Sequence, residues 1–165
     1  MEQSAAAVQG GTNRRSGSAA ETRALGRALG AAAFPGTVLA LTGALGAGKT
    51  QLAKGVAQGL DVESVVNSPT FVLMNEHDGR LRLFHIDAYR LDDPEEALAA
   101  GLLDERQAGG VTVIEWADRL VGWLPQERLD IRIVADPADD RARQLQLEPH
   151  GPAHARLAAA VRDGP

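Results

Sequence analysis

The sequence contains no cysteine. This absence excludes a disulfide scaffold, a zinc site built on thiolates, an iron–sulfur cluster and a cysteine nucleophile. Long hydrophobic runs are missing too: no stretch approaches the roughly 18 residues of a membrane-spanning helix, and residues 1–18 lack the apolar core of a secretory signal. We therefore expect a soluble, cytoplasmic protein with no membrane partner.

Lysine is also scarce. The chain has only Lys49 and Lys54, and arginine supplies the rest of its 17 basic residues. Because arginine and alanine are abundant throughout, the placement of a lysine carries more information than that of either. The 22 acidic residues give a formal net charge of −5, which argues against a broad nucleic-acid-binding surface.

The 165 residues have the length of one domain, since a domain of about 150 residues buries enough surface to fold unaided. Residues 1–17 are small, polar and glycine-rich, and predict a disordered N-terminal tail. Residues 18–150 are predicted to form the domain. Residues 151–165 are predicted to be a C-terminal tail or a short helix.

Helix and strand patterns alternate along this domain, which indicates an α/β fold. Ser18 and Glu21 fit a capping box at a helix start, and Asp93 before a proline opens another helix. An Asp-Gly pair at residues 78–79, between two β-rich runs, predicts a hairpin. Further elements are predicted as a helix at 49–60, buried strands at 37–42 and 111–115, a short strand at 65–66, and alternating strands at 128–134 and 143–148.

Residues 43–50 read GALGAGKT and match the phosphate-binding loop pattern GxxxxGK[ST], with a predicted strand before it and a helix after it. Glycines allow the tight turn that points backbone amides at phosphate oxygens. Lys49 would reach the β- and γ-phosphates, and the Thr50 hydroxyl would hold Mg²⁺. The predicted nucleotide-binding residues are Gly43, Leu45, Gly46, Ala47, Gly48, Lys49, Thr50 and Gln51.

Such a loop needs a second acid to orient magnesium or water, commonly at the end of a buried strand. Glu115 ends an apolar run, and Asp87 ends the second strand of the predicted hairpin. Neighbours of the phosphate-loop strand are normally parallel to it, and a hairpin strand suits that place less well. We therefore favour Glu115 as the acid on the magnesium side, with Asp87 as the alternative.

Several motifs follow one another in a fixed order: GALGAGKT at 43–50, SPTF at 68–71, HIDAYR at 85–90 and IEW at 114–116. This set resembles the TsaE family, the small ATPases of bacterial tRNA threonylcarbamoyladenosine biosynthesis, over about residues 21–147. Ala44 stands where that family usually has aspartate, so any role of that carboxylate is absent here. The departure does not touch Lys49 or Thr50.

The resemblance implies a P-loop NTPase-like three-layer α/β domain with a mixed, mostly parallel central sheet and one β-hairpin. It implies ATP or ADP and Mg²⁺ as ligands, with Thr50 and Glu115 on the metal. Lys49, Thr70 and Asp87 would be catalytic: Lys49 on the phosphates, Thr70 sensing the γ-phosphate, and Asp87 near the attacking water. The implied partners are the transferase subunit of the threonylcarbamoyl-transfer complex and its non-catalytic paralogue, and tRNA is involved only indirectly.

Other side chains have plainer interpretations. His85 shares a strand face with Asp87, so a structural hydrogen bond to a carboxylate is expected. Trp116 is expected to be a core or docking aromatic, and Tyr89 and Arg90 could contact a partner protein. The segments at 18–22 and 139–143 are candidates for the base pocket only because they flank the sheet.

A small-molecule P-loop kinase is the main alternative function. Such kinases carry an arginine-rich lid, whereas the later arginines of this chain form no compact block. A GTPase is disfavoured because no Asn-Lys-x-Asp motif is present, and an ABC-type ATPase because no Leu-Ser-Gly-Gly stretch is present. A module that binds nucleotide without hydrolysing it also stays open.

Overall fold

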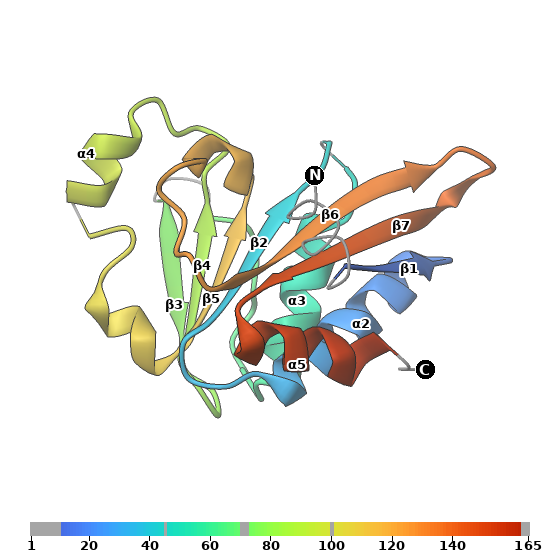
Figure 1. Cartoon of the computed structure of the whole chain (residues 1–165), viewed down its shortest axis with the longest axis horizontal. Coiled ribbons are helices and arrows are strands. Elements are labelled where there is room, and N and C mark those ends of the chain that lie inside the picture. The colour runs from blue at the N-terminus through green and yellow to red at the C-terminus, as the bar shows by residue number, and fades with distance from the viewer. Residues whose placement is uncertain (1–10, 45, 70–72, 100, 163–165) are drawn as a thin grey trace.

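The centre of the molecule is a mixed β-sheet. The structure, a computed structural model, describes residues 11–44, 46–69, 73–99 and 101–162. Within these residues the sheet has seven strands, in the spatial order β1 (Thr12–Ser16), β7 (Asp139–His150), β6 (Arg128–Asp136), β2 (Thr37–Thr42), β5 (Val111–Glu115), β4 (Leu83–Asp87) and β3 (Met74–His77) (Figure 1).

The four inner strands, β6, β2, β5 and β4, are mutually parallel, and the outer pairings are antiparallel. The predicted hairpin is present as β3–β4. The prediction of one hairpin is incomplete, because β6 and β7 form a second hairpin joined at Pro137 and Ala138. Because the inner strands are parallel, the loops after β2, β4 and β5 gather at one edge of the sheet, where α/β proteins place their ligands.

Helices cover both faces of the sheet, which confirms the predicted three layers. One face packs against α2 (Ala19–Ala32), α3 (Lys49–Gly59) and α5 (Pro152–Arg162) (Figure 1). The other packs against α4 (Pro94–Ala99) and the 3₁₀-helix η2 (Ala117–Leu120), while a second 3₁₀-helix, η1 (Glu105–Gly109), precedes β5. Alternation along β5 divides its side chains between these cores: Val113 joins the first and Ile114 the second.

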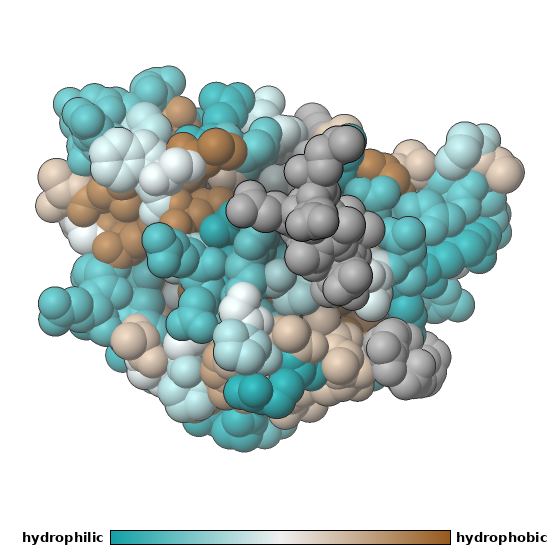
Figure 2. All heavy atoms as spheres, viewed as in Figure 1, coloured by the Kyte–Doolittle hydropathy of each residue, from teal (hydrophilic) through white to brown (hydrophobic). Residues whose placement is uncertain are grey.

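Hydrophilic and apolar side chains gather on different parts of the surface. In Figure 2 hydrophilic side chains cover the β6–β7 hairpin, and apolar side chains gather towards the side of the molecule where α4 and η2 lie. Val121 and Trp123, which follow η2, are exposed. None of the helices in the described ranges is long and apolar enough to cross a lipid bilayer.

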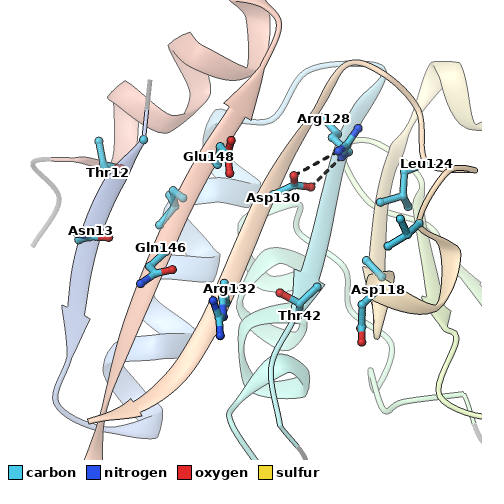
Figure 3. A pocket seen from close by; sticks show the side chains of 14 residues that line it. Thr12, Asn13, Thr42, Asp118, Leu124, Arg128, Asp130, Arg132, Gln146 and Glu148 are labelled. Atoms are coloured by element: carbon cyan, nitrogen blue, oxygen red, sulfur yellow. Dashed lines mark hydrogen bonds and ion pairs between the residues drawn. The ribbon is translucent and has the colours of Figure 1, made fainter. Parts of the chain in front are cut away.

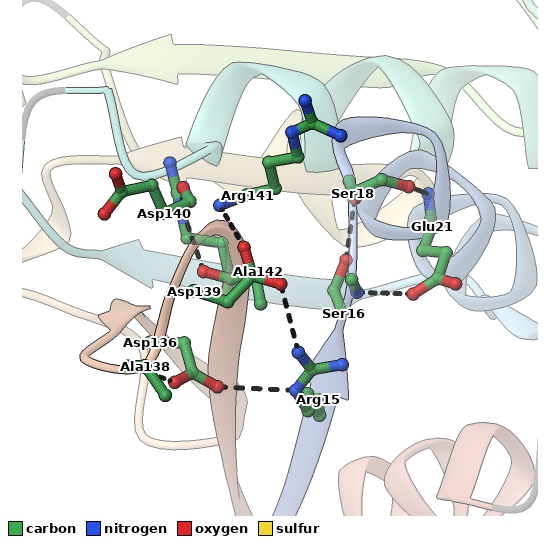
Figure 4. Close-up of polar contacts among 12 residues, drawn as sticks. Arg15, Ser16, Ser18, Glu21, Asp136, Ala138, Asp139, Asp140, Arg141 and Ala142 are labelled. Atoms are coloured by element: carbon green, nitrogen blue, oxygen red, sulfur yellow. Dashed lines mark hydrogen bonds and ion pairs between the residues drawn. The ribbon is translucent and has the colours of Figure 1, made fainter.

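The disordered tail predicted over residues 1–17 is wrong for residues 12–16, which form β1. This strand pairs antiparallel with β7, and Arg15 contacts Asp136 at 3.3 Å and Asp139 at 3.6 Å (Figure 4). Pairing with an existing strand satisfies backbone groups whatever the side-chain hydrophobicity, so a polar composition did not reveal it. Residues 1–10 lie outside the described residues.

Two helices begin at the capping residues that the sequence predicts. The Ser18 hydroxyl accepts a hydrogen bond from the Glu21 amide at 3.2 Å, and the Glu21 carboxylate accepts one from the Gly17 amide. The Asp93 carboxylate accepts from the Glu95 amide at 3.0 Å at the start of α4. Of the two possibilities for residues 151–165, a helix forms, and it packs into the first core as α5.

A buried histidine ties α5 to the sheet. His154 Nε2 accepts a hydrogen bond from the Val38 amide of β2 at 3.1 Å, and the imidazole is fully buried. Only a neutral ring can accept this bond. Burial lowers the pKa of His154, His150 lowers it further, and Glu127 opposes the shift.

We expect the free energy of unfolding to fall as the pH drops below about 6.5, the histidine pKa of an unfolded chain. Below this pH the unfolded chain binds a proton at His154 that the folded chain does not bind, so the free energy of unfolding falls. The fall stops once the pH is below the lowered pKa of His154 in the folded chain. Urea unfolding between pH 7.5 and 5.5 measures it. His154→Gln keeps an acceptor but does not titrate, so its profile should be flatter; an unchanged profile would assign the dependence to other groups.

Candidate functional site

The phosphate-loop motif occupies the turn between β2 and α3, at the carboxyl end of the central parallel strand. Gly43 has φ 149°, and a Cβ at this position would lie 2.4 Å from the Ile133 carbonyl oxygen. Gly48 caps α3 with φ 114°, in the left-handed region. Both positions therefore need glycine. Leu45, also predicted to bind nucleotide, lies outside the described residues.

The carbonyl groups of this loop are held by two cationic side chains. Lys49 Nζ donates to the carbonyls of Gly43 at 2.6 Å and Ala44 at 2.9 Å. From β7, Arg143 Nε donates to the Ala47 carbonyl at 3.1 Å. Arg143 lies in the segment 139–143 suggested for the base pocket, but its contact with the loop carbonyl was not predicted, because the antiparallel return of β7 brings it there.

The Ala47 amide donates to the Ala44 carbonyl at 3.0 Å, but other described amides of the loop lack acceptors. Within the described part of the chain, the amides of Gly46 and Gly48 have no hydrogen-bond partner. The amides of Lys49 and Thr50 open α3, and the first turn of a helix has no acceptor of its own. Free amides at a positive helix end form a ready site for an anion such as a phosphate group.

A cavity of about 410 Å³ opens in front of these amides. It brings together the predicted residues Gly46, Gly48, Lys49, Thr50, Gln51, Asp87 and Glu115, and its other lining residues are Ser68, Tyr89 and Trp116. Gly43 and Ala47 do not line it and belong to the loop behind it. Thr70, the predicted γ-phosphate sensor, lies outside the described residues.

The two candidate acids end neighbouring parallel strands, and Asp87 is the register partner of Glu115. Buried Glu115 accepts hydrogen bonds from Thr50 at 2.9 Å, Ser68 at 3.1 Å and His85 Nε2 at 2.5 Å. Burial alone would raise the pKa of Glu115. The bonds from His85, Thr50 and Ser68 outweigh it and hold that pKa below its usual value.

Asp87 is in a different environment. It is half-buried, and its Oδ1 accepts a hydrogen bond from the Tyr89 amide at 2.9 Å. Burial raises the pKa of Asp87; the Tyr89 bond opposes this shift and the charge of Glu115 adds to it. The carboxylate bond expected for His85 is present, but its partner is Glu115 on the adjacent strand rather than Asp87.

Lys49 is confined on its open side by an aromatic ring. Its side chain is only 4% exposed, and Nζ lies 4.1 Å from the centroid of the Trp116 ring. Burial lowers the pKa of Lys49, and the nearby carboxylates, Glu115 foremost, oppose that shift. The Tyr89 ring packs on Trp116 at 4.8 Å. Trp116 packs partly buried against the second core, as one of its two predicted roles requires, and it also lines the cavity beside Lys49.

A second cavity, of about 340 Å³, adjoins the loop on its other side. Both segments suggested for the base pocket contribute to it: Ser18, Ala19 and Thr22 from the start of α2, and Arg141 and Arg143 from β7. Ser18 and Arg141 are labelled in Figure 4. Gln51 lines both cavities, and its Oε1 accepts a 2.5 Å hydrogen bond from Arg23. The two cavities together could hold the phosphates and the base of one nucleotide.

A third hollow, of about 510 Å³, lies across β1, β7, β6 and β2, opposite the face that packs on α2 (Figure 3). None of the predicted site residues lines it. Its Asp130 already contacts Arg128 at 2.8 Å and His150 at 2.8 Å. Thr42 directly precedes the phosphate loop, but none of the described loop residues 43–50 lines this hollow. Its Arg128 and Asp130 are paired with each other, so it is a separate hollow from the candidate site.

The sequence profile of one family, described as "Threonylcarbamoyl adenosine biosynthesis protein TsaE", matches residues 16–145. The chain belongs to the TsaE family. A TsaE protein of Bacillus subtilis (strain 168) is 48% identical over 123 residues, which cover 73% of this chain and 76% of that protein. A TsaE protein of Treponema pallidum (strain Nichols) is 41% identical over 121 residues, covering 72% and 90%.

The fold of this TsaE-family protein is similar to the crystal structure of Bacillus subtilis YdiB. The TM-score is 0.75 at 34% identity, with 92% of this chain and 93% of that one covered. The resemblance drawn from the four motifs, and the α/β fold that it implied, are confirmed. The family match includes the whole phosphate loop, both acids and Arg143, whereas α5 lies beyond it.

Proposed function

We propose that this TsaE-family chain binds ATP and ADP with magnesium and hydrolyses ATP. Hydrolysis would support tRNA threonylcarbamoyladenosine (adenosine 37) modification by a partner complex of the transferase subunit and its non-catalytic paralogue. The unsatisfied amides of Gly46 and Gly48, beside buried Lys49, support the proposal most directly. The triphosphate would occupy the cavity lined by these groups, and the base would lie against Arg141 and Arg143 in the adjoining one.

The residues present suit a magnesium ion. The Thr50 hydroxyl and the Glu115 carboxylate lie 2.9 Å apart at the edge of the cavity, and hydroxyl and carboxylate oxygens are the hard ligands that Mg²⁺ prefers. Bound magnesium would offset the negative charge of the phosphates. Lys49 would exchange its loop carbonyls for phosphate oxygens, and Thr70 would sense the γ-phosphate.

The two acids would divide the chemistry between them. Neighbouring carboxyls whose pKa values are moved in opposite directions commonly have different roles. Glu115, with its lowered pKa, would stay ionised on the metal side. Asp87, with its raised pKa, would orient the attacking water and accept a proton from it.

This division predicts a selective defect. We expect Glu115→Gln to lower magnesium-dependent ATP hydrolysis at least about tenfold, since losing a metal-site group commonly costs 10–100-fold. Binding of ADP in the presence of EDTA should stay close to wild type, because the loop amides and Lys49 are untouched. Phosphate release and calorimetry measure the two quantities. The assignment would be reversed if Asp87→Asn, but not Glu115→Gln, abolished the magnesium effect.

The function itself is tested by reconstitution with the partner subunits. We expect slow phosphate release from the chain alone, faster release with the complex, and tRNA modification that requires ATP. Coupling needs the partner to bind the ATP and ADP forms with different affinity. A complex that modifies tRNA equally well with Lys49→Ala would refute the proposal, and label from ATP found on a small-molecule acceptor would favour a kinase.

A further inference from the structure

Ser68 lies at the centre of the polar cluster and has no role in the functional assignment so far. Its hydroxyl oxygen is 2.9 Å from that of Thr50 and 3.1 Å from Glu115 Oε2. Thr50 in turn lies 2.9 Å from Glu115 Oε1. Ser68 belongs to the segment that follows α3, so three separate parts of the chain meet here.

The cluster is short of one proton. Each hydroxyl carries a single proton, and the geometry has both Thr50 and Ser68 donating to Glu115. No proton is then left for the 2.9 Å contact between the two hydroxyl oxygens.

Glu115 does not supply the missing proton. Both of its oxygens accept hydrogen bonds: Oε1 from Thr50, and Oε2 from both Ser68 and His85 Nε2. Two hydroxyl oxygens therefore face each other beside a carboxylate, an arrangement that a cation between the oxygens would stabilise.

The spacing of the oxygens fits a magnesium ion. Magnesium binds oxygen at about 2.0–2.1 Å with octahedral geometry, so adjacent ligand oxygens lie about 3.0 Å apart. The three contacts of the cluster measure 2.9, 2.9 and 3.1 Å.

We propose that Ser68 is a third protein ligand of the magnesium site, beside Thr50 and Glu115. This inference rests on the proposed function. It makes the segment around Ser68 part of the metal site, and thereby joins that segment to the phosphate loop.

The test exploits the absence of cysteine from the chain. Mn²⁺ prefers the same oxygen ligands as Mg²⁺, whereas a thiolate prefers softer ions such as Cd²⁺. The full chain with ADP is titrated with Mn²⁺, and free Mn²⁺ is measured by electron paramagnetic resonance. Cd²⁺ is then added until the Mn²⁺ is displaced. The variants are Ser68→Ala and Ser68→Cys, with folding checked by circular dichroism.

A matched control comes from the same segment. The Ser64 hydroxyl is 2.8 Å from His77 Nδ1 and lies outside the cavity. Ser64→Ala and Ser64→Cys therefore report the cost of losing a hydroxyl or adding a thiol near the site. Glu115→Gln serves as the positive control.

We expect Ser68→Ala to weaken Mn²⁺ binding about tenfold and Ser64→Ala to leave it unchanged. In Ser68→Cys, Cd²⁺ should displace Mn²⁺ at a concentration about tenfold or more below that needed for wild type or Ser64→Cys. Wild-type Mn²⁺ affinity in Ser68→Ala would overturn the role of Ser68, and so would an unchanged Cd²⁺ preference in Ser68→Cys. If Glu115→Gln loses Mn²⁺ binding in the same experiment, the proposed function still stands. A wild-type chain that adds nothing to the Mn²⁺ affinity of ADP overturns the proposed function as well.

Discussion

Replacing Lys49 with alanine is expected to weaken ATP and ADP binding by about 10–100-fold. The ammonium group makes charge-assisted hydrogen bonds to phosphate, and such bonds contribute about 1.5–3 kcal/mol each. The fold should persist. Among the described residues, the hydrogen bonds of Lys49 go to the carbonyls of its own loop, at 2.6 and 2.9 Å, and water entering the adjoining cavity can take its place.

The other lysine provides the control for this change. Lys54 lies on the same helix, α3, but does not line the cavity. Lys54→Ala removes the same charge and should leave nucleotide affinity close to wild type. Isothermal titration calorimetry measures both variants, and circular dichroism reports their folding. Equal affinity of Lys49→Ala and wild type would reject the assignment of the phosphate loop.

Gly55→Ala is expected to lower the free energy of unfolding more than any of the other substitutions named above. Helices α2 and α3 pack through paired glycines, Gly26 and Gly30 on α2 against Gly55 and Gly59 on α3. A Cβ at residue 55 would lie 2.1 Å from the Arg23 carbonyl oxygen. Backbone atoms cannot rotate aside as side chains do, so one helix must shift.

Overpacking of this kind commonly costs 1–3 kcal/mol, and the rigid neighbours lead us to expect at least about 3 kcal/mol here. This loss must also exceed the helix propensity of alanine, which is about 1 kcal/mol more favourable than that of glycine in an open helix. Gly109→Ala is the control, since its Cβ would meet nothing within 4 Å. Urea unfolding compares the two, and equal losses would show that α2 and α3 separate without strain.

The site elements that follow from local sequence were predictable. The phosphate loop was recognisable because its glycine spacing, Lys49 and Thr50 all lie within one short segment between a strand and a helix. Glu115 and Asp87 were recognisable because each ends an apolar run, and parallel strands bring such ends together. The nucleotide-binding, metal-binding and catalytic roles of all these residues stay predictions, and Thr70 and Leu45 lie outside the described residues.

Features that depend on pairing between distant segments were not predictable. The bond from His85 goes to Glu115 because β4 and β5 are adjacent and in register, and one strand pattern does not reveal its neighbour. Residues 12–16 are polar and became a strand only by pairing with β7. The short strand expected at residues 65–66 is absent, and Val65 is 80% exposed: two β-branched residues without a pairing partner do not make a strand.

The backbone at Trp116 has a consequence for engineering. This residue has φ 59° and ψ 43°, a left-handed conformation that costs a non-glycine residue about 1–2 kcal/mol. Glycine would relieve that strain and remove the ring beside Lys49. It would also remove the packing of that ring on Tyr89 and on the second core, and losing a packed tryptophan commonly costs about 3–5 kcal/mol. A selection for heat resistance would therefore keep the tryptophan and its strained backbone.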